Sequence, residues 1–145
     1  MGASGFVGMD LHQKLHRIGL LAFVWTDSHA ALTSAALLNN KDVAIAISHT
    51  GATVDTIDAL RTASEHGATT VAITNFASSP LAELADHVLT TAARETTFRS
   101  GAMASRIAQL AVIDCLFVGV AQRFYDTAMT ALEDTYAAMR GRRLN

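Results

Sequence analysis

Cysteine and proline are almost absent from this sequence, and aromatic residues are few. The single cysteine, Cys115, excludes a disulfide framework and favours a reducing compartment; because it lies in an apolar run, it is expected to be a buried, inert thiol. The longest apolar stretch, residues 107–122, is interrupted by Gln109 and Asp114 and is expected to be too polar and too short to span a membrane. No signal peptide is expected either, so the sequence predicts a cytoplasmic protein without a membrane partner.

Charge of either sign is also sparse. Charged residues make up 17% of the chain and the formal net charge is −2, which gives no reason to expect nucleic acid as a direct partner. The one basic cluster, formed by Arg140, Arg142 and Arg143, is interpreted as a short solvated tail. Half of the 145 residues are hydrophobic, which excludes a disordered chain and predicts one domain.

Short apolar runs alternate with helical patterns through the first two-thirds of the chain. Runs that are apolar on both faces are typical of parallel strands covered by helices on both sides. Strands joined by helices indicate crossover connections, and hence an α/β fold with a doubly wound parallel sheet. The predicted strands are residues 20–25, 43–47, 71–73 and 87–89, and the predicted helices are residues 6–19, 28–38, 54–66 and 81–85.

The last third of the chain differs from the rest. Between residues 102 and 140 there is no proline and Gly119 is the only glycine, so one long helix or two consecutive helices are predicted. Apolar residues at three- and four-residue steps form one narrow seam there. The seam packs either onto the chain's own sheet or onto a second copy, and the sequence favours neither. Its members are Tyr125, Met129, Leu132, Tyr136 and Met139.

A loop rich in hydroxyl groups follows the most apolar predicted strand. Ser48, Thr50 and Thr53 offer hydroxyl donors, and Gly51 allows a tight turn and a close approach of the backbone to a ligand. The loop opens a helix, whose free N–H groups and dipole favour an anion. Thr53 alone is equally explained as a helix cap, but the whole pattern predicts a phosphate site made of neutral donors. The loop matches neither a P-loop nor a dinucleotide fingerprint, and no cofactor or metal is expected.

Two further loops are predicted to lie at the same edge of the sheet, since ligands bind where parallel strands end. Residues 2–5, Gly-Ala-Ser-Gly, run directly into the first helix. Residues 90–101 follow the last predicted strand and contain Arg94, Glu95, Arg99 and Ser100.

These segments together resemble one family. Residues 48–53, Ser-His-Thr-Gly-Ala-Thr, are similar to the Ser-x-Ser/Thr-Gly-x-Thr phosphate loop of SIS (sugar isomerase) domains, and residues 2–4 resemble the Gly-x-Ser turn after their first strand. Residues 94–106, 73–75 and 79–82 resemble the RpiR-type regulators within that family. The likeness covers essentially the whole chain in the right order.

The resemblance implies a flavodoxin-like, five-stranded sheet that binds a phosphorylated sugar. It assigns the phosphate to Ser48, Thr50, Gly51 and Thr53. Ser4 and Ser100 would flank the sugar and the phosphate. Glu95 would face the sugar hydroxyls, and His49 is a further candidate contact at a position where the family tolerates other residues.

Three functions fit such a domain. The favoured one is the effector-sensing domain of an RpiR-type regulator, which forms a homodimer or larger oligomer and contacts DNA only through a domain absent from this chain. The alternative is a sugar-phosphate isomerase or related lyase, with Glu95 and His49 as its acid–base pair. A SIS fold retained only for oligomerisation is disfavoured, because a scaffold has no use for the hydroxyl loop.

The resemblance also implies a strand that this sequence does not contain. In a flavodoxin-like order, the first strand lies between the strands predicted at residues 20–25 and 43–47. The natural protein is therefore expected to extend upstream of Met1, with that strand and a helix-turn-helix domain. Direct pairing of the two flanking strands, or a strand from another chain, would be the alternatives.

Overall fold

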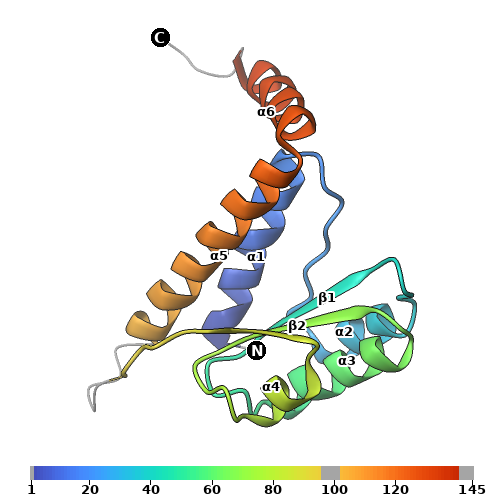
Figure 1. Ribbon diagram of the computed structural model, residues 1–145, viewed down its shortest axis with the longest axis vertical. Coiled ribbons are helices and arrows are strands. Elements are labelled where there is room, and N and C mark those ends of the chain that lie inside the picture. Colours follow the sequence, from blue (N-terminus) through green and yellow to red (C-terminus); the bar gives the residue numbers. More distant parts are fainter. Residues whose placement is uncertain (1, 96–101, 141–145) are drawn as a thin grey trace.

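The computed structural model describes residues 2–95 and 102–140 of the chain. Three strands and six helices make up this part of the molecule (Figure 1). The strands are β1 (Val43–Ile47), β2 (Thr69–Thr74) and β3 (His87–Thr90). The helices are α1 (Gly2–Arg17), α2 (Ser28–Ala35), α3 (Val54–Glu65), α4 (Pro80–Leu84), α5 (Met103–Arg123) and α6 (Tyr125–Met139).

The sheet is parallel and has the order β1-β2-β3. Ile47 of β1 is in register with Ile73 of β2, and Thr74 of β2 with Thr90 of β3, so the strands end along one edge. We call this the carboxyl edge. Helix α3 connects β1 to β2 and α4 connects β2 to β3, as crossover connections between parallel strands require. The α/β class and three of the four predicted strands are confirmed.

Helices cover the sheet on both faces, because side chains alternate along each strand. Ala72 of β2 packs with Leu60 of α3 and Leu81 of α4 on one face. The next residue, Ile73, packs with Val7 of α1 and Ile113 of α5 on the other. We call these the α3–α4 face and the α1–α5 face.

The strand predicted at residues 20–25 is wrong. These residues are extended, and exposed side chains alternate with half-buried ones as in a strand: Leu21 is 78%, Phe23 69% and Trp25 47% exposed. A strand also needs a hydrogen-bonded neighbour, and in the described part of the chain β1 pairs only with β2. Direct pairing between residues 20–25 and β1 is therefore wrong as well.

The extended segment instead lies against α1. A Cβ added at Gly5 would meet Thr26 Cγ2 at 2.9 Å, and one added at Gly8 would meet Val24 Cγ2 at 3.2 Å. Glycine at these two positions of α1 therefore lets the segment approach the helix closely.

The long C-terminal helix is divided at Phe124, where φ is −118° and ψ is 41°. Helix α5 packs along α1, and Lys14 of α1 lies 2.5 Å from Asp114, which explains a carboxylate within the apolar run. Helix α6 then points away from the sheet (Figure 1). The seam on α6 therefore does not pack onto the chain's own sheet.

Two expectations about α5 need correction. Cys115 is exposed, because the inner face of α5 carries Ser105, Gln109 and Ile113. Helix α5 is also long and apolar enough to cross a membrane by length and composition, contrary to the expectation from its polar interruptions. Core helices of soluble proteins pass the same test, so this property assigns no membrane to the protein.

Candidate functional site at the carboxyl edge

The hydroxyl loop leaves β1 at Ser48 and leads into α3. Ser48 is buried, and its Oγ lies 3.1 Å from Thr53 Oγ1. This hydrogen bond joins the first and last residues of the loop. The N–H of Gly51 donates to Ser48 Oγ at 3.2 Å, and the N–H of Ala52 donates to Thr50 Oγ1 at 3.3 Å. The loop is therefore held in one shape by its own hydroxyl oxygens.

Thr53 occupies the N-cap position of α3 but does not cap the helix through its side chain. A capping threonine accepts a hydrogen bond from an N–H of the first turn. Here the hydroxyl pairs with Ser48 instead. The first turn of α3 keeps backbone N–H groups that no residue of the helix can satisfy.

Gly51 has the backbone geometry and surroundings that only glycine fits. Its φ is +63°, in the left-handed region, and an added Cβ would lie 2.1 Å from Ser79 Oγ and 2.9 Å from Thr74 Oγ1. Its carbonyl accepts the N–H of Leu81 at 3.0 Å. The loop is thus seated on the start of α4.

His49 links the loop to the end of β2. Its carbonyl accepts the N–H of Asn75 at 3.0 Å and the hydroxyl of Thr74 at 3.2 Å. The imidazole lies edge-on to the Phe76 ring with 5.8 Å between centroids, and its Nδ1 is buried without a hydrogen-bond partner in the described part of the chain.

Asn75 is a residue of this edge that the residue pattern did not single out. Its Oδ1 accepts the hydroxyl of Thr91 at 3.0 Å and the N–H of Ala93 at 2.7 Å. It therefore joins the end of β2 to the segment that follows β3. The available signal was its position, since a polar residue immediately after a buried parallel strand lies at the ligand edge.

Glu95 precedes α5 in the sequence, and its side chain reaches the first turn of that helix. Its Oε1 accepts the N–H of Ser105 at 2.9 Å, and a carboxylate at a helix N-terminus is stabilised by the helix dipole. Residue 102, which precedes the helix, has a left-handed backbone with φ 59°. Ser100 lies outside the described residues, as does Arg99, and their predicted positions stay predictions.

Ser4 lies in the first turn of α1, so the predicted loop at residues 2–5 is already helical. Its hydroxyl donates to Oε1 of Gln109 at 3.3 Å, which joins the start of α1 to α5. Gln109 is 1% exposed, and its Nε2 has no hydrogen-bond partner among the described residues. From the residue pattern, Gln109 was described only as a polar interruption of an apolar run, without a role in the site.

The hydroxyl loop is neutral, and the described part of the chain offers no metal site. The loop between Ser48 and Thr53 holds no lysine or arginine, so an anion there would meet only neutral donors. Within residues 2–95 and 102–140, no cluster of three or more histidine, cysteine, aspartate or glutamate side chains is suited to hold a metal ion.

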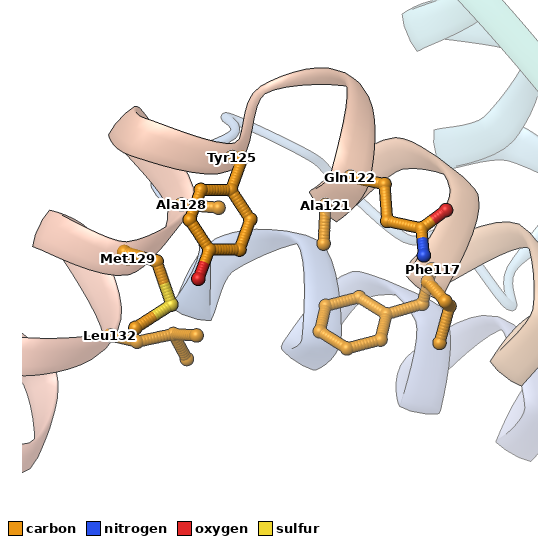
Figure 2. A pocket seen from close by; sticks show the side chains of 8 residues that line it. Phe117, Ala121, Gln122, Tyr125, Ala128, Met129 and Leu132 are labelled. Carbon is orange, nitrogen blue, oxygen red and sulfur yellow. The ribbon is translucent and has the colours of Figure 1, made fainter.

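A hollow of about 150 Å³ lies elsewhere, between α5 and α6. Figure 2 shows Phe117 of α5 opposite Tyr125, Met129 and Leu132 of α6. Three members of the predicted seam therefore line this apolar groove, well away from the carboxyl edge.

Comparisons with known proteins identify the family. The model of the SIS domain family matches residues 1–119. An uncharacterized HTH-type transcriptional regulator from Caldanaerobacter subterraneus subsp. tengcongensis is 46% identical over 145 residues, which cover all of this chain and 51% of that protein. The uncharacterized HTH-type transcriptional regulator YbbH from Bacillus subtilis is 38% identical over 99% of this chain and 51% of its own length. The chain thus spans about half the length of these relatives.

Solved structures agree with this assignment. NanR of Vibrio vulnificus, complexed with ManNAc-6P, superposes with a TM-score of 0.91 at 30% identity, over 100% of this chain and 55% of that one. The sugar isomerase domain of an RpiR transcription factor from Sphaerobacter thermophilus has a TM-score of 0.83 at 31% identity, over 94% and 75% of the two chains. The chain belongs to the SIS domain family and is similar to the SIS domains of RpiR-type transcriptional regulators.

Proposed function

We propose that this chain is the effector-sensing domain of an RpiR-type transcriptional regulator and binds a phosphorylated sugar at the carboxyl edge of its sheet. The observation that carries the proposal is the hydroxyl pair of Ser48 and Thr53, which faces inward across the loop instead of capping α3. The relatives are transcriptional regulators, and NanR binds ManNAc-6P. DNA is contacted by a helix-turn-helix domain outside these 145 residues, and the protein acts in the cytoplasm.

The loop offers donors in the number that a phosphate needs. In the Ser48–Thr53 pair one hydroxyl donates to the other, which leaves one hydroxyl hydrogen of the pair for the ligand. The Thr50 side chain is exposed and accepts from Ala52, so its hydrogen is a second donor. The N-terminus and dipole of α3 complete a neutral anion site.

The position of Glu95 favours a sensor over an isomerase. An isomerase needs a carboxylate that takes and returns a proton beside the sugar carbons. The Glu95 carboxylate accepts the backbone N–H of Ser105 at the start of α5, so one of its oxygens already has a structural partner. A sugar phosphate that contacts Glu95 would thereby alter the anchoring of α5, which leads to the exposed groove.

Calorimetric titration of Ser48→Ala and Thr53→Val with sugar phosphates tests the site. Hydrogen bonds to a charged group contribute about 1.5–3 kcal/mol each, so each variant should bind about 10- to 100-fold more weakly. Thr130→Val, which removes an exposed hydroxyl on α6, is the matched control and should bind normally. Removal of the phosphate from the ligand should weaken binding more than either substitution. Unchanged affinity in both loop variants would contradict the proposal.

Turnover assays separate the two functions. We expect no interconversion of aldose and ketose phosphates by the purified protein, even for sugars that bind. Activity that is abolished in Glu95→Gln would reverse this ranking.

A further inference from the structure

We infer that Gln109 is a second recognition residue of the site, whose side-chain amide donates a hydrogen bond to an oxygen on the sugar part of the ligand. The inference rests on the proposed function, since it concerns the same ligand. It assigns the sugar oxygen to α5 and leaves the phosphate to the hydroxyl loop.

The side-chain amide nitrogen of Gln109 is an unpaired hydrogen-bond donor in the protein interior, where unpaired donors are rare. The residue is 1% exposed, its Oε1 accepts from Ser4, and its Nε2 is buried without a partner in the described part of the chain. Buried amide groups are nearly always paired, and an unpaired N–H lowers stability relative to an apolar side chain of the same size. The exception is explained if a ligand supplies the missing acceptor.

The position of Gln109 on α5 places this donor near the carboxyl edge. Ile113 packs against Ile73, the next-to-last residue of β2. Gln109 lies one helical turn, about 6 Å, nearer the start of α5, and both residues lie on the buried face of the helix. Figure 1 shows α1 and α5 side by side, and Ser4 fixes the carbonyl end of the Gln109 amide from the first turn of α1.

A chain of contacts also connects Gln109 with the phosphate loop. The His49 carbonyl accepts from Asn75, and Asn75 in turn accepts from Ala93 in the segment after β3. Two residues further on, Glu95 accepts from Ser105, which lies one turn before Gln109 on the same face of α5. The segment after β3 therefore connects the hydroxyl loop with the start of α5, the helix that carries Gln109.

The chemistry of an amide suits a neutral oxygen. A hydroxyl or carbonyl oxygen of the sugar accepts from Nε2, and this bond forms in a water-poor place where an unpaired group is penalised. A site of this kind discriminates strongly against an analogue that lacks the oxygen. Gln109 is thus expected to determine which sugar phosphate binds, while Ser48 and Thr53 determine that a phosphate binds at all.

Gln109→Met tests this, because methionine has a similar length and no strong donor. Calorimetric titrations would use glucose 6-phosphate, fructose 6-phosphate, ribose 5-phosphate, ManNAc-6P and inorganic phosphate. We expect the best sugar phosphate to bind about 10-fold more weakly to the variant, from the loss of one buried hydrogen bond, and inorganic phosphate to bind equally well. The melting temperature should change little, because the variant removes an unpaired buried donor but also the acceptor of the Ser4 hydroxyl.

A measurement on the unaltered protein keeps the inference testable if the variant folds poorly. The side-chain amide resonance of Gln109 should shift in NMR spectra when the best sugar phosphate is added, and should stay in place with inorganic phosphate. A deoxy analogue that lacks the recognised oxygen should leave it unshifted too.

The outcomes separate the two proposals. Unchanged sugar-phosphate affinity in a folded Gln109→Met, or an unmoved amide resonance on sugar-phosphate binding, would overturn the role of Gln109 alone. An equal loss of affinity for inorganic phosphate together with a lower melting temperature would show a structural role and overturn it as well. Failure of all four sugar phosphates to bind the unaltered protein would overturn both proposals.

Discussion

The two faces of the sheet differ in how completely their covering helices bury apolar side chains. On the α3–α4 face, small and medium side chains such as Ala46, Leu60, Ala72 and Leu81 are buried in a closed layer. On the α1–α5 face, α5 continues past the sheet into α6, and both helices leave large apolar side chains in solvent. Those that are at least half exposed are Met103, Ile107, Val118, Phe124, Tyr125, Tyr136 and Met139. The buried residues of the first layer are covered within this chain, and the second exposes apolar side chains of the kind that a partner covers.

The outer edge of β1 is also uncovered in the described part of the chain. The extended segment at residues 20–25 presents Leu21, Phe23 and Trp25 to solvent, and β1 has no second neighbour in the described part of the chain. Such an edge exposes unpaired backbone N–H and C=O groups. A further strand placed beside β1 would satisfy these groups.

The largest difference between the faces should appear in a pair of core and surface substitutions. Leu60 is 2% exposed on the α3–α4 face, and Leu60→Ala should lower the free energy of unfolding by about 2–5 kcal/mol. Ile107 is 62% exposed on α5, and Ile107→Ala should leave that quantity unchanged within about 0.5 kcal/mol. Urea denaturation measures both. Equal losses would show that α5 is covered as completely as α3.

Two glycines give a second pair. Gly51→Ala forces a left-handed residue against Ser79 and should destabilise the protein by about 1–3 kcal/mol, with loss of phosphate binding. Gly119→Ala, in the middle of α5, meets no atom within 4 Å and should stabilise the protein by about 0.5–1 kcal/mol. Thermal melts and phosphate titrations check both signs. A neutral Gly51→Ala would contradict the fit between the loop and α4.

The exposed seam on α6 is expected to be a contact between two copies of the chain. Leu132 lines the apolar groove, and Leu132→Glu places a charge there, so the dimer should dissociate at least about 10-fold more readily. Asp126→Lys, on the same helix, alters a charge that is already exposed and should have a smaller effect. Light scattering at micromolar concentration measures the assembly. A monomeric unaltered protein would refute the contact.

The sequence predicted those features that are recorded locally. Residues 43–47 are apolar on both faces and are followed by the hydroxyl loop, so this strand and the loop's position at the carboxyl edge were both predictable. The absence of a strand at residues 20–25 was not predictable, because strand formation depends on a hydrogen-bonded neighbour that lies elsewhere in the sequence. Exposed and half-buried side chains alternate along these residues, but in the described part of the chain no strand forms backbone hydrogen bonds with them.

The exposure of Cys115 and the burial of Gln109 on α5 were unpredictable for the same reason. The helix is apolar almost all round, so its period does not reveal which face is buried. Cys115 was expected inside and lies outside, while Gln109 was treated as an interruption and lies in the core. Only the packing of α1 on α5, with the hydrogen bond from Ser4, shows that Gln109 lies on the buried face of the helix.

The smallest effect on stability is expected from a substitution of Asp86, which links the start of β3 to β2. Its carboxylate accepts the backbone N–H and the hydroxyl of Thr70, each at 2.8 Å, and these bonds hold the pKa of Asp86 below its usual value. A lowered pKa in the folded state stabilises the protein above the unfolded pKa of about 4, and this contribution disappears as the pH falls through the folded pKa. Asp86→Asn should therefore melt slightly lower than the unaltered protein at pH 7, with the difference closing as the pH falls through the folded pKa of Asp86. Asp134→Asn on α6 is the control, and a difference for Asp86→Asn that persists unchanged at low pH would contradict the role of the charge.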